Sequence, residues 1–173
     1  MHLWLSVPLV LISAPALAAP VLNLPPRPPG AATGSQFVAQ ITSLALTARE
    51  EAIYDAVASG NVPDFLRTLA AVTVNRTINS VNHTATYYVI PDYIAIGTDA
   101  DYFLCPMTPL LAQKIADFAG CSLPTRRMVD AIWAAAPLHL NPQPIAPSPQ
   151  MTTVPVFNDH NTMVYTQRSG HFG

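Results

Sequence analysis

The chain has 173 residues, of which 10% are charged and 50% hydrophobic, and its formal net charge is -2. A disordered chain would be more charged and less apolar, and a protein that binds nucleic acid or anionic membranes would carry a basic patch. The composition therefore indicates a folded protein and excludes nucleic acid as a partner. A protein or an extracellular polymer is left as the candidate partner.

Residues 1–18 have the layout of a secretory signal peptide. An apolar run from Leu3 to Ile12 precedes small residues and the triplet Ala16-Leu17-Ala18, which is the pattern of an h-region and a cleavage site. The run is shorter than the about 20 apolar residues that cross a bilayer, so we expect no transmembrane segment. We therefore expect an exported protein, secreted or periplasmic, whose mature chain begins near Ala19.

Most of the 18 prolines lie in two clusters, one on each side of a stretch of ordinary globular composition. Proline has no backbone N–H and favours extended chain. The composition therefore predicts a Pro-rich linker over 19–34, a folded domain over 35–136, and a Pro-rich extended tail over 137–173 whose end looks incomplete.

Helical spacing of apolar residues predicts a helix over about 35–46, followed by a second helix that ends near Ser59. Thr47 and Glu50 fit a capping box at the start of this second helix. Further along, Thr108 and Thr125 are expected to cap two more helices, because threonine at this position accepts a bond from a free backbone N–H.

The pattern between these two pairs of helices has a period of two, which is typical of strands. It starts at Val72, turns at 79–82, and continues through 84–90, 93–96 and 101–105. The sequence therefore predicts an α+β fold, in which a small antiparallel sheet of about three strands packs against four or five helices.

The segment 88–133 contains the runs PDYIAIGTDAD and LPTRRMVDAI. With these runs the chain resembles an uncharacterised family of exported bacterial proteins, in which both recur in this order. The resemblance covers about residues 35–168 and brings no known activity. It implies a chain that continues past Gln167, so we expect this one to be a truncated member, the N-terminal part of a larger exported protein.

The two cysteines, Cys105 and Cys121, form a candidate disulfide, since exported proteins commonly pair their cysteines. A bridge closing a loop of this length contributes roughly 3 kcal/mol in the chain-entropy model. The alternative is two buried free thiols, and the sequence leaves both open.

Three acidic residues, Asp92, Asp99 and Asp101, lie close together in the sequence and are the first candidate metal ligands. Carboxylates on a flexible loop suit Ca²⁺, although the spacing does not match an EF-hand. The alternative is turn and capping chemistry, which aspartate commonly provides.

Asp159 and His160 are a second candidate metal pair, with His139 and His171 nearby in the sequence. Histidine and aspartate bind zinc and act as general bases. Neighbours in sequence do not face each other, however, and the alternative is that these are surface side chains.

The sequence contains no nucleophile elbow, P-loop or dinucleotide-binding motif. Two functions stay open. The first is a non-catalytic binding or packing domain, or the N-terminal part of a larger exported protein. The alternative is an exported hydrolase, acting on a cell-wall or other extracellular polymer, with a His/Asp metal site. Neither a catalytic residue nor a cofactor is identified.

Overall fold

The structure is a computed structural model that describes residues 19–168, so the predicted signal peptide lies outside the described residues. The elements are, in chain order, α1 (Gly34–Ile41), α2 (Leu46–Ala58), a 3₁₀ turn η1 (Asp64–Leu66), β1 (Ala70–Ile78), β2 (Val81–Val89), β3 (Ala95–Thr98), β4 (Asp101–Leu104), α3 (Pro109–Phe118), α4 (Arg126–Ala135) and α5 (Val154–Arg168). The fold is α+β, as predicted.

The strands form two separate antiparallel hairpins, so the prediction of one sheet with three strands was wrong. In the first, β1 pairs with β2 from Ala70↔Val89 to Ile78↔Val81, and in the second β3 pairs with β4. The chain bends through Pro91–Tyr93 between them, and proline there cannot donate to a sheet ladder. The bend directs the following strand away from β2.

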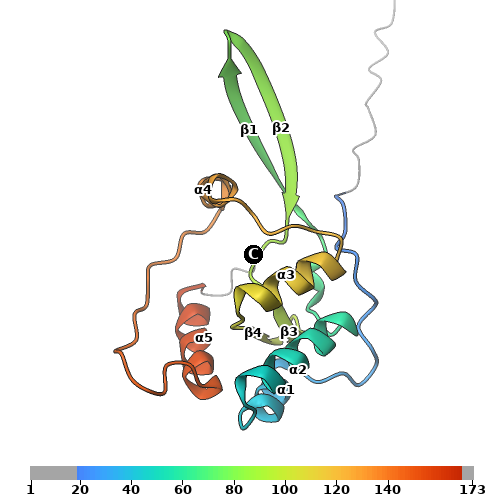
Figure 1. The fold of residues 1–173 in the computed structure, drawn as a ribbon, viewed down its shortest axis with the longest axis vertical. Helices are drawn as coiled ribbons and strands as arrows, with labels where there is room; N and C mark the ends of the chain where they lie inside the picture. Colours follow the sequence, from blue (N-terminus) through green and yellow to red (C-terminus); the bar gives the residue numbers. More distant parts are fainter. Residues whose placement is uncertain (1–18, 169–173) are drawn as a thin grey trace, which may run out of the picture.

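The two hairpins have opposite environments. β3 and β4 lie among the helices, whereas β1 and β2 project from the body of the molecule (Figure 1). Asn79 and Ser80 both have positive φ, at 50° and 62°, which is the conformation of the tight turns that join two antiparallel strands. The turn residues thus set the register of the long hairpin.

The hydrophobic core unites the helices with the buried hairpin. It takes residues from α1, α2, η1, β3, β4, α3 and α5 and from the segments that join them, namely Phe37, Ile41, Ile53, Val57, Val62, Leu66, Ala95, Ile96, Tyr102, Phe103, Cys105, Leu111, Ile115 and Val154. Burial of this apolar surface is the main force that holds the helices together, since short helices are marginal on their own.

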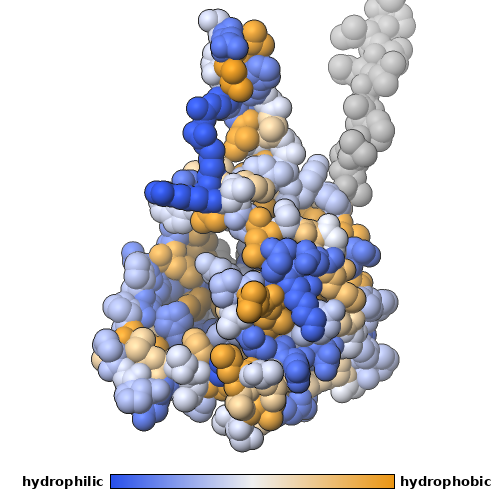
Figure 2. Space-filling model, in the orientation of Figure 1, coloured by the Kyte–Doolittle hydropathy of each residue, from blue (hydrophilic) through white to orange (hydrophobic). Residues whose placement is uncertain are grey.

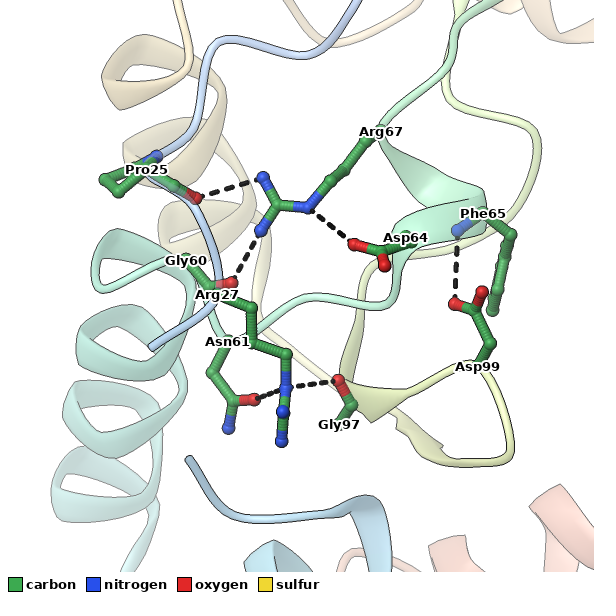
Figure 3. Close-up of polar contacts among 9 residues, drawn as sticks. All are labelled: Pro25, Arg27, Gly60, Asn61, Asp64, Phe65, Arg67, Gly97 and Asp99. Atoms are coloured by element: carbon green, nitrogen blue, oxygen red, sulfur yellow. Dashed lines mark hydrogen bonds and ion pairs between the residues drawn. The ribbon is translucent and has the colours of Figure 1, made fainter. Parts of the chain in front are cut away.

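The segment predicted as a linker, 19–34, is instead bound to the core (Figure 3). Leu22 is buried. The Arg27 guanidinium donates from Nε to the Asn61 side-chain oxygen at 2.9 Å and to the Gly97 carbonyl at 3.1 Å. Arg67 donates to the Pro25 carbonyl at 3.0 Å. Prolines leave backbone carbonyls without local partners, and arginine supplies the missing donors.

Gly60 allows this segment to approach α2 closely. Its φ is +84°, and a Cβ built there would lie 2.2 Å from the Pro25 carbonyl oxygen. Glycine populates positive φ without steric cost and has no side chain to collide with the passing chain.

The predicted extended tail was wrong for residues 154–168, which form α5 and pack against α1 and β4. Both flanking segments therefore belong to the folded unit, which is not limited to 35–136. The buried stripe of α5 runs at helical spacing through Val154, Phe157, Asn161, Tyr165 and Arg168. Because this stripe mixes apolar with polar residues, the sequence shows no apolar periodicity here that would predict a helix.

Two predicted helix caps are confirmed, and one is wrong. The Thr108 and Thr125 hydroxyls accept bonds from Leu111 N–H and Met128 N–H at the starts of α3 and α4. In contrast, α2 begins after Ala45 with no side-chain cap. Glu50, expected to reach back to Thr47, instead accepts from the Thr108 N–H at 2.7 Å and so joins α2 to the start of α3.

The candidate disulfide is not formed, and both cysteines are free. Cys105 is buried directly after β4, and Cys121 is exposed just beyond α3. A helix of ten residues, such as α3, is about 15 Å long, whereas a disulfide needs Cα atoms within about 7 Å. The length of α3 thus keeps the two thiols apart.

Candidate functional site

The three acidic candidates each bind a different neighbour in the protein. Asp92 forms a buried ion pair with Arg168, whose Nη1 lies 2.5 Å from Asp92 Oδ2. Asp99 accepts from the Phe65 N–H at 3.2 Å (Figure 3). Asp101 accepts from both the N–H and the hydroxyl of Ser35, each at 2.9 Å. These bonds are the turn and packing chemistry that the sequence left open as the alternative.

Asp101 carries a pKa shift that agrees with this role. Partial burial raises the pKa of its carboxyl, but hydrogen bonds from the Thr33 side chain and from Ser35 outweigh it, so the pKa lies below its usual value. The carboxylate is therefore held ionised at the start of α1, where negative charge is favourable.

The second candidate pair, Asp159 and His160, forms no metal site with His139 in the described part of the structure. Asp159 is exposed on α5. His160 is half-buried and lines an open depression of about 400 Å³ together with Leu140, Asn141, Pro142, Gln143, Pro144, Val164 and Gln167. His139 binds elsewhere, with its Nε2 2.6 Å from the Trp133 carbonyl. His171 lies outside the described residues.

No three histidine, cysteine, aspartate or glutamate side chains are grouped to hold a metal ion anywhere in residues 19–168. Catalysis by Cys105 receives no support either. Burial raises the pKa of the Cys105 thiol far above its usual range, and the thiolate is the nucleophilic form.

A buried polar cluster around Arg168 was missed by the sequence reasoning. Besides the pair with Asp92, Arg168 Nη1 donates to the Tyr102 hydroxyl at 3.2 Å, and the Tyr165 hydroxyl donates to the Tyr102 carbonyl at 2.5 Å. Asn161 donates to the Leu104 carbonyl at 3.2 Å. The helical spacing of Asn161, Tyr165 and Arg168 is the signal that identifies these residues as one face.

The protonation states in this cluster favour a structural role. Burial raises the pKa values of Tyr102 and Tyr165. Burial lowers the pKa of Arg168, but the bond and charge of Asp92 outweigh it and raise the pKa above its usual value. Each group therefore keeps its proton at neutral pH and holds α5 on the core.

The β1–β2 hairpin presents two different faces, because residues directly opposite in the register share a face. One face is polar, with side-chain hydrogen bonds across the strands within the pairs Thr73–Thr86, Asn75–Thr84 and Thr77–Asn82. The other carries the pairs Ala70–Val89, Val72–Tyr87, Val74–Ala85, Arg76–His83 and Ile78–Val81. We call the latter set the apolar hairpin face.

Only the base of the apolar hairpin face is covered. Val72 is buried, and the Tyr87 hydroxyl donates to the Met128 carbonyl of α4 at 3.2 Å. Near the tip, Ile78 is 49% exposed and Val81 57% exposed. Figure 2 shows hydrophobic residues, in orange, along the projecting hairpin. Exposed apolar side chains on a projecting element, with no core beneath them, make this end of the hairpin a candidate interaction surface.

Helix α4 adds to this exposed surface. It packs beside β1 at the base of the hairpin (Figure 1), yet none of its residues is buried. Val129 is 48% exposed and Trp133 65% exposed. An amphipathic helix that buries no residue has a face still to be covered.

Within residues 19–168 no helix has both the length and the apolar character to cross a membrane. Comparisons with models of known protein families, with curated proteins and with solved structures found no match.

Proposed function

We propose that this chain is an exported, non-catalytic binding module whose β1–β2 hairpin and α4 dock a protein partner. The observation that carries the proposal is the apolar hairpin face, which the rest of residues 19–168 leaves uncovered beyond its base. An isolated two-stranded ribbon is marginally stable in water, so the tip gains stability when a partner covers it.

The contrast with the candidate catalytic residues supports the same proposal. Asp92, Asp99 and Asp101 are engaged in bonds that hold the core together. Asp159 and His160 occur without a third ligand among the described residues. The exported hydrolase, the alternative from the sequence, receives no supporting observation.

Photo-crosslinking tests the proposal. A benzophenone amino acid replaces Ile78 or Val81 in the full chain, expressed in the cells that produce it, and a matched control places it at Leu110. Leu110 is apolar, lies on α3 and is 83% exposed, so it reports contacts made by exposure alone. We expect a discrete protein adduct from the hairpin positions and none from Leu110.

Equal labelling from both positions, or no adduct from the hairpin, would contradict the docking role. Zinc analysis of the purified protein tests the alternative directly. Stoichiometric zinc that is lost in His160→Ala would overturn the proposed non-catalytic role and favour the hydrolase.

A further inference from the structure

The outer edge of β2 is suited to pair with another strand. The ladder with β1 is continuous over nine residue pairs and contains no bulge. β2 contains neither proline nor lysine, and its only ionisable side chains are His83 and the two tyrosines. Proteins usually protect an edge strand from pairing with proline, with lysine or other charged residues, or with an element that covers the edge. Among the described residues no third strand pairs with β2, and α4 packs against β1 and reaches β2 through the side chain of Tyr87.

We propose that β2 pairs in antiparallel fashion with β2 of a second copy of this chain, to form a four-stranded sheet. The inference goes beyond the proposed docking role of the hairpin, because it concerns the edge of β2 and leaves the apolar hairpin face free for the docked partner. A two-fold axis at Ala85 is compatible with the whole length of the strand, because equal numbers of β2 residues, Val81–Thr84 and Thr86–Val89, lie on the two sides.

The sequence of β2 is self-complementary in this register. On the apolar hairpin face, Ala85 lies opposite Ala85 of the other copy, His83 opposite Tyr87, and Val81 opposite Val89. On the polar face, Thr84 meets Thr86 and Asn82 meets Tyr88. No two like charges face each other, and every cross-strand pair matches apolar or aromatic side chains, or side chains that hydrogen-bond.

The pairing also removes the weakness of the isolated ribbon. Three or more strands with an apolar face are needed for independent stability, and two copies supply four. The backbone N–H and C=O groups at the outer edge of β2 gain partners. The apolar hairpin face becomes one continuous surface shared by both copies.

The test is the oligomeric state of the mature protein, measured by light scattering and sedimentation over a concentration series. We expect a dimer. Ala85→Lys places two ammonium groups opposite each other at the axis, and we expect it to weaken the dimer by about tenfold or more. The matched control is Ala71→Lys, the same change at an exposed alanine of β1, which should leave the dimer intact.

A mixing experiment keeps the proposal testable if the lysine variant is poorly folded. Ala85→Glu mixed with Ala85→Lys should form a heterodimer, since the charges at the axis then attract. A monomeric wild-type protein, or equal effects of Ala85→Lys and Ala71→Lys, would overturn the self-pairing. A monomer that still crosslinks through Ile78 to a different protein would overturn it and leave the proposed docking role intact.

Discussion

The helical core buries its apolar residues, whereas the β1–β2 hairpin leaves several of its apolar residues exposed. In the core, side chains from the helices and from the buried hairpin cover one another, and the largest of them, including Phe103 and Ile53, are almost fully buried. In the hairpin, Ile78 and Val81 stand on a ribbon with nothing from the core beneath them. The core therefore derives its stability from its own chain, whereas the hairpin is left with surface for a partner.

Polar residues show the same contrast. In the core, Arg27, Arg67 and Arg168 each bind groups that lie far away in the sequence and fix the two flanking segments in place. In the hairpin, the side-chain bonds of the polar face, such as the one between Thr73 and Thr86, run only across the ribbon. Long-range bonds make the core one unit, and local bonds leave the hairpin separable from it.

The largest expected difference comes from truncating apolar side chains in the two regions. Phe103→Ala should lower the free energy of unfolding by about 3–5 kcal/mol, because it removes a fully buried ring and leaves a cavity. Ile78→Ala should cost less than about 1 kcal/mol, because half of this side chain is already in water. Urea denaturation of both variants measures the difference, and similar losses would refute the comparison.

The ion pair that anchors α5 should have the next largest effect. Arg168→Met leaves the Asp92 carboxylate buried without its cation, and breaking a buried pair costs about 3 kcal/mol or more. Hydrogen exchange should show α5 opening before the rest of the core. The control is Arg168→Met combined with Asp92→Leu, which removes both charges and should recover most of the stability. A double variant as unstable as the single one would speak against this account.

Gly60→Ala tests how tightly the N-terminal segment is bound to the core. The substitution forces an alanine to φ +84° and places its Cβ 2.2 Å from the Pro25 carbonyl oxygen. Gly120→Ala is the control, since Gly120 has φ +68° with no atom within 4 Å of the built Cβ. The control should cost about 1 kcal/mol for backbone conformation alone, and Gly60→Ala clearly more. Equal losses of stability for the two variants in thermal melts would show that the N-terminal segment shifts at little energetic cost.

The smallest expected effect is a pH dependence at Asp101. Its pKa is lower in the folded protein than in the unfolded chain, so the folded state binds this proton less readily. The stabilisation it contributes is present above the unfolded pKa of about 4 and is lost as the pH falls through the folded value. Asp101→Asn should flatten the acid side of the stability curve, whereas Asp159→Asn, on the exposed side of α5, should not. Identical curves for the two variants would exclude the role of Asp101.

Local features of the fold were predicted well from the sequence. The Thr108 and Thr125 caps, the turn within 79–82 and the end of α2 near Ser59 all depend on residues within a few positions of one another. Their physical basis is a hydrogen bond or a backbone preference that a short window of sequence contains.

The candidate site was predicted less well. Asp92 was recognised as a candidate, but its partner Arg168 lies at the other end of the folded unit, and no spacing rule joins them. The prolines of 19–34 and 137–153 suggested extended chain, which hid the arginine contacts of the first segment and the helix that follows the second. The sequence also did not show that the hairpin face is exposed, because exposure depends on how far the core extends along the ribbon, and the core covers only its base.

By itself, the sequence determined the α+β class and the type of the helices and strands from α1 to α4, because these follow from caps, turns and the periodicity of apolar residues. The tertiary structure alone decided that the strands divide into a buried and a projecting hairpin, that both Pro-rich flanks lead into the core, and that Cys105 and Cys121 stay apart. Those outcomes depend on contacts between residues distant in the chain. Such contacts are fixed by how the elements pack as a whole, and no local pattern encodes them.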